Sequence, residues 1–300
     1  MDKKKIIKKI ALKDSDYPSL LREIPDPPAV LYVLGDLPDE KIPRLAIVGT
    51  RKATSSGCLI AKVLAKELSE AGFIIVSGLA MGIDTAGHEG VLASRGKTIA
   101  VLGNGLNGIY PRLNKNLAEQ ILELGGAIIS EYPPNEPAFP SNFLARNRIV
   151  SGLCLGTIVV EAPERSGSLV TARLALEQNR EVFIVPGPAD HPNYAGSHQL
   201  IREGARLVVS AKDILTDLNI NPPIPEKKFS PAEESILRIF PKNNSDAQRD
   251  RSPDQKRRGK MLSVDKIIEL TKLDSQTVNK TIAFLIIKGE IKEVLGRYSL

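Results

Sequence analysis

The sequence predicts an α/β fold in which helices cover both faces of a mostly parallel sheet, followed by a smaller helical domain. From Arg44 to about Leu218, short apolar runs alternate with helical patterns, which is typical of a doubly wound sheet. Several of these runs are almost wholly apolar, as strands covered on both faces must be. At the prolines of residues 221–225 the alternation stops, and a different pattern begins.

Seven strands are expected in the large domain, each a short apolar run that ends at small or polar residues. Their expected ranges are 45–48, 73–76, 98–102, 127–129, 156–160, 181–185 and 207–209. The helices between them are expected to begin near Ser56, Asp84, Asn114, Phe143, Ser168 and Gly196. Since parallel strands all end at one rim, the small polar loops that follow them are expected to converge there, where open α/β sheets bind ligands.

The C-terminal residues form a second pattern of helices and short strands. Ser230 and Glu233 form a capping box around Pro231, which suits the first position of a helix. The expected helices cover 231–240, 263–271 and 275–288, with Gly289 as a stop, and the expected strands cover 290–294 and 297–300. Three helices followed by a hairpin is the order of a winged-helix domain.

Four parts of the chain are therefore expected. Residues 1–43 are an N-terminal extension that packs on the core, and residues 44–220 are the doubly wound domain. A proline-rich linker at 221–229 leads to the winged-helix domain at 230–300. The polar and charged segment 242–260 cannot bury a core, so we expect a disordered basic insert there.

The positive charge of the chain lies mainly in its C-terminal part. The formal net charge is +6, and residues 221–300 contain 16 Lys and Arg against 11 Asp and Glu. Residues 1–220 contain 25 against 24, so the large domain is not a basic surface. Any binding of nucleic acid by that domain must come from a local pocket. For the basic insert, nonspecific contact with nucleic acid and a solvated linker without function remain equally open.

The two cysteines and the N-terminus indicate a cytoplasmic protein. Cys58 and Cys154 lie among apolar neighbours and are expected to be buried thiols, which suits the reducing cytoplasm. Lys8 and Lys9 interrupt the apolar run that an export signal requires. No membrane span or insertion is expected.

Ser166, Gly167 and Ser168 form the most informative loop of the chain, because they follow an apolar strand and open a helix. A helix N-terminus has unsatisfied N–H groups and a partial positive charge, so small residues there let an anion reach the backbone. The expected anion is a phosphate. Its source is a nucleotide cofactor, a small substrate or a nucleic-acid backbone.

Phe143, Arg146, Asn147 and Arg148 suggest the third source. Arginine binds phosphate bidentately, asparagine can hydrogen-bond a base edge, and a phenylalanine ring offers a stacking face. With Arg51 at the end of the first strand, these residues would extend the anion site into a track for a polymer backbone. Taken alone, residues 143–148 would also fit an ordinary helix with exposed charges and one core phenylalanine.

No cofactor and no metal are expected. Residues 103–108 match the dinucleotide pattern G-x-G-x-x-G, but Tyr110 and Pro111 stand where that motif requires a helix. The three histidines have no metal-ligand spacing among themselves or with the cysteines. Asp84 and His88 are four residues apart on one helix, and we expect a hydrogen-bonded structural pair rather than acid/base chemistry.

Many short motifs, in order along nearly the whole chain, resemble those of the DprA (Smf) family of DNA-processing proteins. The matching segments are Tyr17-Pro18, residues 27–32 (PPAVLY), 46–51 (AIVGTR), 76–84 (VSGLAMGID) with His88, 101–105 (VLGNG), Tyr110-Pro111, 130–133 (SEYP), 146–149 (RNRI), 166–172 (SGSLVTA), 185–187 (VPG) and Gly204-Ala205.

This resemblance implies an extended Rossmann-like domain that binds single-stranded DNA without catalysis and forms a homodimer. It also implies that the protein protects incoming DNA and assists RecA loading in natural transformation and recombination, displacing or bypassing single-strand-binding protein. The rim pocket that contacts DNA in the family would map here onto the following residues. They are Arg51, Ser77, Gly78, Gly82, Phe143, Arg146, Asn147, Arg148, Ser166, Gly167 and Ser168.

The chain departs from the family pattern in three places. No helical N-terminal domain precedes Tyr17, so its role in relatives is expected to be absent here or supplied otherwise. Leu144 follows Phe143 where many relatives have proline, which alters the pocket wall. The basic insert has no family role that can be assigned. The third helix of the winged-helix domain carries only Lys280 and Lys288 among apolar residues, so an interaction role is expected before duplex binding.

Two other functions remain open. A nucleotide hydrolase or phosphoribohydrolase would use the same rim with Glu161 or Asp84 as the acid, although no strong acid/base constellation accompanies either residue. A ligand-sensing transcription factor would bind a nucleotide at the rim and read duplex DNA with its winged helix. The first predicts turnover of nucleoside monophosphates, and the second predicts sequence-dependent affinity for duplex DNA.

Overall fold

The computed structural model describes residues 6–220, 231–240, 261–287, 291–294 and 297–299. These residues belong to two compact units, one within residues 1–225 and the other within residues 226–300. The expected linker at 221–229, the basic insert at 242–260 and Ser230 of the expected capping box lie outside the described residues. The domain bounds inferred from the sequence stay a prediction.

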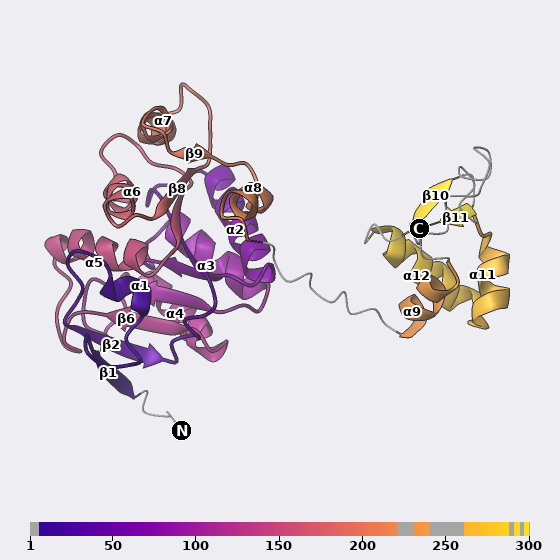
Figure 1. The fold of residues 1–300 in the computed structure, drawn as a ribbon, viewed down its shortest axis with the longest axis horizontal. Helices are drawn as coiled ribbons and strands as arrows, with labels where there is room; N and C mark the ends of the chain where they lie inside the picture. Colours follow the sequence, from indigo (N-terminus) through magenta and orange to yellow (C-terminus); the bar gives the residue numbers. More distant parts are fainter. Residues whose placement is uncertain (1–5, 221–230, 241–260, 288–290, 295–296, 300) are drawn as a thin grey trace. The chain divides into compact units, whose positions relative to one another are not determined.

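Nine strands of the first unit form one sheet in the order β1-β2-β6-β5-β4-β3-β7-β8-β9 (Figure 1). β2 pairs antiparallel with β1 and β6, whereas all pairings from β6 to β9 are parallel. The strands are β1 (Ile7–Ala11), β2 (Val30–Gly35), β3 (Arg44–Val48), β4 (Ile74–Ser77), β5 (Thr98–Val101), β6 (Ala127–Ser130), β7 (Gly156–Val159), β8 (Glu181–Ile184) and β9 (Arg206–Leu207).

Helices pack on both faces of this sheet (Figure 1). One face is covered by α1 (Ser19–Arg22), α5 (Pro140–Gly152), α6 (Gly167–Glu177) and α7 (Ala195–Arg202). The other is covered by α2 (Ser55–Glu70), α3 (Ile83–Ala93), α4 (Lys115–Glu123) and α8 (Ala211–Asp217). The buried residues of β3 alternate between these two cores: Ala46 and Val48 enter one, Leu45 and Ile47 the other. This burial on both faces explains why the strands are apolar throughout.

The predicted doubly wound, mostly parallel sheet is confirmed. All seven predicted strands are present, with ends that differ by one or two residues. From β3 the chain adds β4, β5 and β6 in one direction, and after α5 it returns to place β7 on the other side of β3. This reversal creates a topological switch point between β3 and β7, the position at which such sheets bind ligands. α5 begins earlier than expected, with Pro140 in its first turn.

The N-terminal segment contributes two strands, β1 and β2, that are not among the seven predicted strands. β1 pairs with β2 at the edge of the sheet, and its Lys8 and Lys9 are exposed. An edge strand with charged outward residues has no continuous apolar run, because only part of it is covered. Tyr17 and Leu21, which follow β1, are buried in the core beneath α5 and α6.

In its described residues, the second unit contains three helices followed by an antiparallel hairpin. They are α9 (Pro231–Arg238), α11 (Val264–Thr271), α12 (Ser275–Ile287), β10 (Lys292–Val294) and β11 (Arg297–Ser299). Ser263 caps α11 by accepting a hydrogen bond from the Lys266 N–H at 3.4 Å. Ile236, Ile267 and Val278 belong to its small buried core. This is the element order that the sequence predicts, and the assignment as a winged helix stays a prediction.

Candidate nucleic-acid interface

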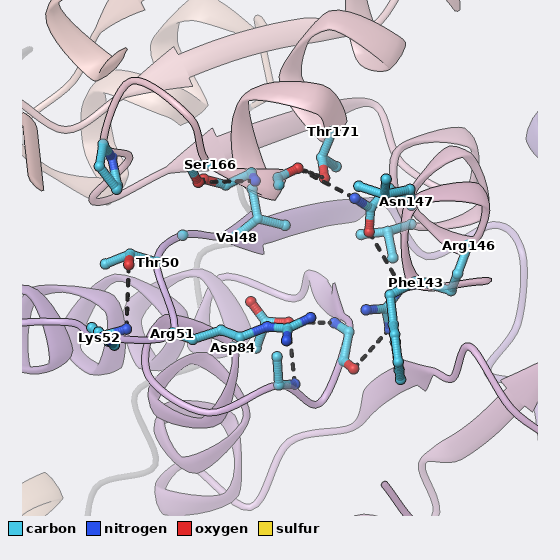
Figure 2. A pocket seen from close by; sticks show the side chains of 18 of the residues that line it. Val48, Thr50, Arg51, Lys52, Asp84, Phe143, Arg146, Asn147, Ser166 and Thr171 are labelled. Atoms are coloured by element: carbon cyan, nitrogen blue, oxygen red, sulfur yellow. Dashed lines mark hydrogen bonds between the residues drawn. The ribbon is translucent and has the colours of Figure 1, made fainter. Parts of the chain in front are cut away.

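A cleft of about 480 Å³ opens at the carboxyl ends of β3 and β7, at the switch point of the sheet. Its walls come from the loop after β3, the loop that leads into α3, the first half of α5 and the N-terminus of α6. Figure 2 shows Ser166, Asn147 and Thr171 on one side of the cleft and Arg51, Lys52 and Asp84 on the other. Loops that are far apart in the sequence thus form one site.

Eight of the eleven predicted site residues line this cleft. They are Arg51, Gly78, Phe143, Arg146, Asn147, Ser166, Gly167 and Ser168. Ser77 and Gly82 lie behind the lining, and Arg148 points elsewhere. The contact of each residue with DNA stays a prediction, whereas their common location is now a property of the fold.

Three exposed cations surround the cleft. Arg51, Lys52 and Arg165 line it, and none of them has an ion-pair partner within the described ranges. Most exposed ion pairs of the first unit lie elsewhere, for example Lys62 with Glu89 on α2 and α3. The near-neutral large domain therefore has a local concentration of uncompensated positive charge at this site, which suits an anionic ligand.

Arg146 is a buried cation at the base of the cleft, with only 4% of its surface exposed. Its Nη1 donates to the carbonyl oxygen of Gly78 at 2.7 Å and to that of Val101, and its Nε donates to Asn147 Oδ1 at 3.3 Å. Burial lowers the pKa of Arg146 to about 10, so the guanidinium stays protonated at neutral pH. The residue therefore gives the cleft a fixed positive charge that does not depend on a mobile side chain.

Asp84 is a buried counter-charge that acts on Arg146 without a direct ion pair between the two side chains. Its Oδ2 accepts hydrogen bonds from the N–H groups of Gly78 at 3.1 Å and Ala80 at 3.3 Å. Burial raises the pKa of Asp84, and the charge of Arg146 opposes that rise. A Cβ atom at Gly78 would collide with the guanidinium of Arg146, so only glycine lets the loop approach this closely. Asp84 and Arg146 together hold the loop after β4 in place.

Gly82 and Ser77 shape the same loop without lining the cleft. Gly82 has φ +80°, and a side chain there would press on the backbone of Thr50 and Arg51. Ser77 is buried, and its hydroxyl donates to the carbonyl oxygen of Ile47 at 2.6 Å. Both residues therefore connect this loop to the end of β3, which carries Arg51.

Phe143 is already covered by protein groups. The Arg51 Cζ lies 5.6 Å from the centre of the Phe143 ring, and the Tyr110 ring centre lies 5.2 Å from it. Figure 2 shows Arg51 extending across the cleft toward Phe143. A Cβ atom at Gly103 would also contact this ring. Phe143 thus packs against Arg51 and Tyr110, which are both more exposed than Phe143 itself.

The N-terminus of α6 is largely capped by its own residues. Ser166 Oγ accepts from the Ser168 N–H at 3.1 Å and is also hydrogen-bonded to Ser168 Oγ. The Leu169 N–H donates to the carbonyl oxygen of Ser166 at 3.1 Å. Among these first amides, only that of Gly167 lacks an acceptor within the described residues. The loop therefore offers an anion fewer free N–H groups than its sequence suggests.

Asn147 joins α5 to the same helix N-terminus. Its Nδ2 donates to the carbonyl oxygen of Gly167 at 3.2 Å, while its Oδ1 accepts from Arg146. The side-chain amide is therefore engaged with the protein on both sides. Its position fixes the spacing between the buried guanidinium and the Ser166–Ser168 loop.

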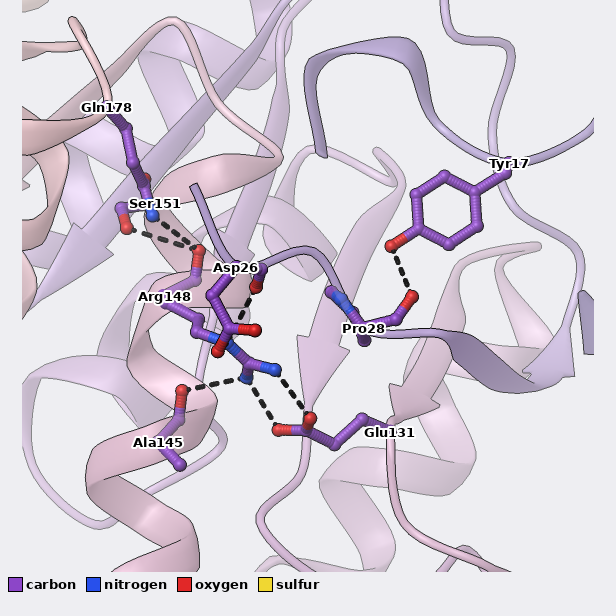
Figure 3. Close-up of polar contacts among 8 residues, drawn as sticks. All are labelled: Tyr17, Asp26, Pro28, Glu131, Ala145, Arg148, Ser151 and Gln178. Atoms are coloured by element: carbon purple, nitrogen blue, oxygen red, sulfur yellow. Dashed lines mark hydrogen bonds and ion pairs between the residues drawn. The ribbon is translucent and has the colours of Figure 1, made fainter. Parts of the chain in front are cut away.

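Arg148 does not join the cleft (Figure 3). Its Nη1 and Nη2 donate to both carboxylate oxygens of Glu131 at 2.7 Å, and its Nε donates to Asp26 at 2.9 Å. The hydrogen bonds that Arg148 donates to the Glu131 carboxylate raise the pKa of Arg148. Arg146 and Arg148 are two residues apart on a helix and project from different sides of it. Arg148 therefore connects the N-terminal segment to β6 and α5.

The expected pair of Asp84 and His88 is not formed. Asp84 accepts from backbone amides, whereas His88 Nδ1 is hydrogen-bonded to Thr98 Oγ1 at 2.8 Å. Thr98 itself donates to the carbonyl oxygen of Ile75, so His88 must donate through Nδ1. Burial, together with the nearby charge of Arg146, lowers the pKa of His88 to about 3. A spacing of four residues places both side chains near one another, but each finds a closer partner on a neighbouring strand or loop.

Glu161, the other candidate acid, is a structural carboxylate. It accepts hydrogen bonds from the Thr54 amide and hydroxyl, from Asn193 Nδ2 at 2.9 Å and from the Tyr194 hydroxyl at 3.1 Å. Burial raises the pKa of Glu161, but these hydrogen bonds outweigh burial and lower it overall. Both carboxylate oxygens are occupied, and the residue connects the start of α2 to the segment before α7.

The lining also contains residues that were not among the predicted site residues, notably Lys52, Tyr110 and Arg165. Lys52 and Arg165 directly follow or precede residues that were predicted, so the loop sequences contain the signal. Tyr110 lies in the segment after β5, and it packs against Phe143 at the site. Within the described ranges, no helix is long and apolar enough to cross a membrane, and no cluster of acidic, His and Cys side chains could hold a metal ion.

Sequence comparison identifies relatives over most of the first unit. A model of the family "DNA recombination-mediator protein A" matches residues 8–219. Protein Smf of Escherichia coli is 46% identical over 230 residues, which cover 75% of this chain and 62% of the relative. DNA processing protein DprA of Streptococcus pneumoniae is 44% identical over 207 residues, which cover 69% of this chain and 73% of the relative. The chain thus spans about three fifths of the Escherichia coli protein's length.

Two solved structures share this fold. The X-ray structure of DNA processing protein A from Streptococcus pneumoniae matches with a TM-score of 0.65 and 42% identity, over 70% of this chain and 74% of that chain. DNA processing protein A from Helicobacter pylori, whose structure was described for its single-stranded DNA binding mode, matches with a TM-score of 0.60 and 31% identity. That match covers 71% of this chain and 96% of that chain. The family resemblance inferred from the motifs is confirmed, and this chain belongs to the DNA recombination-mediator protein A (DprA/Smf) family.

Proposed function

We propose that the protein binds single-stranded DNA in the cleft at the switch point and does so without catalysis. The observation that carries this proposal is a group of three exposed cations without an ion-pair partner in the described residues. They are Arg51, Lys52 and Arg165, and they share the cleft with the half-exposed ring of Tyr110. Single-strand binding proteins combine a positively charged groove with aromatic rings for the bases. The single-stranded DNA binding of the Helicobacter pylori relative supports the same choice of ligand.

In this proposal Arg51, Lys52 and Arg165 bind successive phosphates, and Arg146 adds a fixed charge beneath them. Each exposed cation that neutralises a phosphate of a single strand contributes about −0.7 to the slope of log affinity against log salt. Three such contacts predict a slope of about −2. If each non-hydrogen atom needs roughly the 10–15 Å³ of cavity volume that one water needs, a cavity of about 480 Å³ has room for about two nucleotides.

A noncatalytic role agrees with the state of the two candidate acids. Both carboxylate oxygens of Glu161 and Oδ2 of Asp84 accept hydrogen bonds that hold loops in place, which supports a structural role for the two residues. The finer role is also part of the proposal: a cytoplasmic homodimer protects incoming single strands and helps to load RecA during transformation and recombination. Displacement of single-strand-binding protein would be part of that loading.

Replacement of Arg51 tests the site. Arg51 is exposed, so Arg51→Ala should leave the unfolding free energy unchanged within about 0.5 kcal/mol. Loss of one charge-assisted phosphate contact should weaken oligo-dT binding about tenfold or more and reduce the salt slope to about −1.4. Arg173→Ala removes an exposed arginine of α6 outside the cleft lining and is the matched control.

Fluorescence anisotropy with a single strand, a duplex and a labelled nucleotide distinguishes this proposal from its rivals. Tight, salt-dependent and sequence-independent binding of the single strand supports it. Turnover of the nucleotide would favour a hydrolase, and sequence-dependent duplex binding would favour a transcription factor. If folded Arg51→Ala binds oligo-dT as tightly as the parent protein, the DNA does not occupy this cleft.

A further inference from the structure

We propose that Tyr110, with Met81 and Pro111, forms a subsite for one unpaired nucleobase beside the phosphate-binding cations. This inference rests on the proposed binding of single-stranded DNA and adds where a base is held. The subsite is a small cavity of about 100 Å³ that adjoins the main cleft and shares Arg51, Phe143 and Arg146 with it.

The lining of this cavity suits an aromatic ring. Tyr110 is 46% exposed and Met81 is 40% exposed, and both lie at its edge together with Pro111. Large apolar side chains that remain exposed around one cavity indicate a binding site rather than scattered surface residues. Thioether and aromatic groups both make favourable contacts with a flat ring.

The size of the cavity selects a single base. A water-sized atom needs roughly 10–15 Å³ of cavity volume. A cavity of about 100 Å³ therefore holds roughly seven to ten non-hydrogen atoms. This is about the size of one pyrimidine base and far below that of a base pair. A duplex would have to expose a base by unpairing and unstacking it, which costs a few kcal/mol. The cavity therefore disfavours a duplex without any repulsive contact.

Tyr110 offers a more accessible ring than Phe143. The Arg51 guanidinium lies 5.6 Å from the centre of the Phe143 ring, and Phe143 in turn supports Tyr110, at 5.2 Å between ring centres. A base on Phe143 would first have to displace Arg51 from the ring. A base on Tyr110 leaves Arg51 in place, close enough to bind a phosphate of the same strand.

Oligonucleotides that contain abasic residues distinguish the contribution of this subsite to affinity from that of the phosphate contacts. The full chain is titrated with fluorescent oligo-dT and with an oligomer of the same length that contains abasic residues. Loss of one stacked base should weaken binding roughly 5- to 150-fold. Tyr110→Ala should therefore bind oligo-dT at least fivefold more weakly than wild type and bind the abasic oligomer within twofold of wild type. Tyr110→Phe, the matched control, keeps the ring and should match wild type on both.

Photocrosslinking supplies a second readout. An oligo-dT that carries 5-iodouracil should crosslink on irradiation to the peptide that contains Tyr110. The proposal is overturned if Tyr110→Ala weakens both oligomers equally, if wild type binds them equally well, or if the crosslink maps to Phe143. Each of these results leaves single-strand binding itself intact. If wild type binds neither oligomer, the proposed function fails and the subsite with it.

Discussion

Removing the buried charge of Arg146 should destabilise the fold by several kcal/mol, and removing Asp84 as well should restore part of the loss. Arg146 and Asp84 are 4% and 7% exposed, and each favours the charged form of the other. The two side chains form no direct ion pair, but leaving one of two interacting buried charges uncompensated costs about 3–5 kcal/mol. Arg146→Met additionally leaves the carbonyl oxygens of Gly78 and Val101 without a donor.

The double variant distinguishes charge compensation from packing. Asp84→Asn keeps an oxygen that can accept from Gly78 and Ala80, so its own cost arises mainly from the unpaired Arg146. We expect each single variant to lose about 3–5 kcal/mol and the double variant to lose no more than the worse single variant. The coupling energy in the cycle is then about 3 kcal/mol or more.

Urea unfolding at pH 7 measures these values. Circular dichroism and tyrosine fluorescence should be followed together, since the chain has six tyrosines and no tryptophan. Arg165→Met, which removes an exposed arginine of the same cleft, should change the unfolding free energy by no more than about 0.5 kcal/mol. A cost of Arg146→Met below about 1 kcal/mol, or additive costs in the cycle, would refute the role of Asp84 as counter-charge.

Two further predictions concern residues outside the lining. Arg148→Met should lower the unfolding free energy by about 2 kcal/mol, because Glu131 loses a bidentate partner. The affinity of this variant for oligo-dT should stay within twofold of wild type. A tenfold loss of affinity without destabilisation would instead make Arg148 a DNA contact. His88 is neutral when folded, with a pKa of about 3, whereas the unfolded chain takes up a proton below about pH 6.5. Stability should thus be full above pH 6.5 and fall by about 2 kcal/mol from pH 7.5 to 5.0 through this group, as measured by urea unfolding at both pH values. His88→Gln should lack this contribution, and the half-exposed His198→Gln should retain it; equal pH dependence in all three proteins would contradict the assignment.

The sequence by itself determined the class of fold, the family and the loops of the site. Apolar runs such as β3 and β7 are buried on both faces, so their composition alone marks them as interior parallel strands. The loops that follow such strands must reach one rim, and Arg51 and Ser166 could be assigned to one site for that reason. These conclusions depend on local patterns and on the rules of parallel sheets.

Only the tertiary structure decided which side chains of those loops are free to bind. Arg146 and Arg148 look equivalent in the sequence, but one lies at the base of the cleft and the other is held by Glu131 and Asp26. Tyr110 joins the site through its contact with Phe143, and Asp84 and His88 separate because each has a nearer partner. Hydrogen bonds and charge pairs between distant segments form only after the sheet assembles, so local sequence patterns do not identify the partners of these side chains.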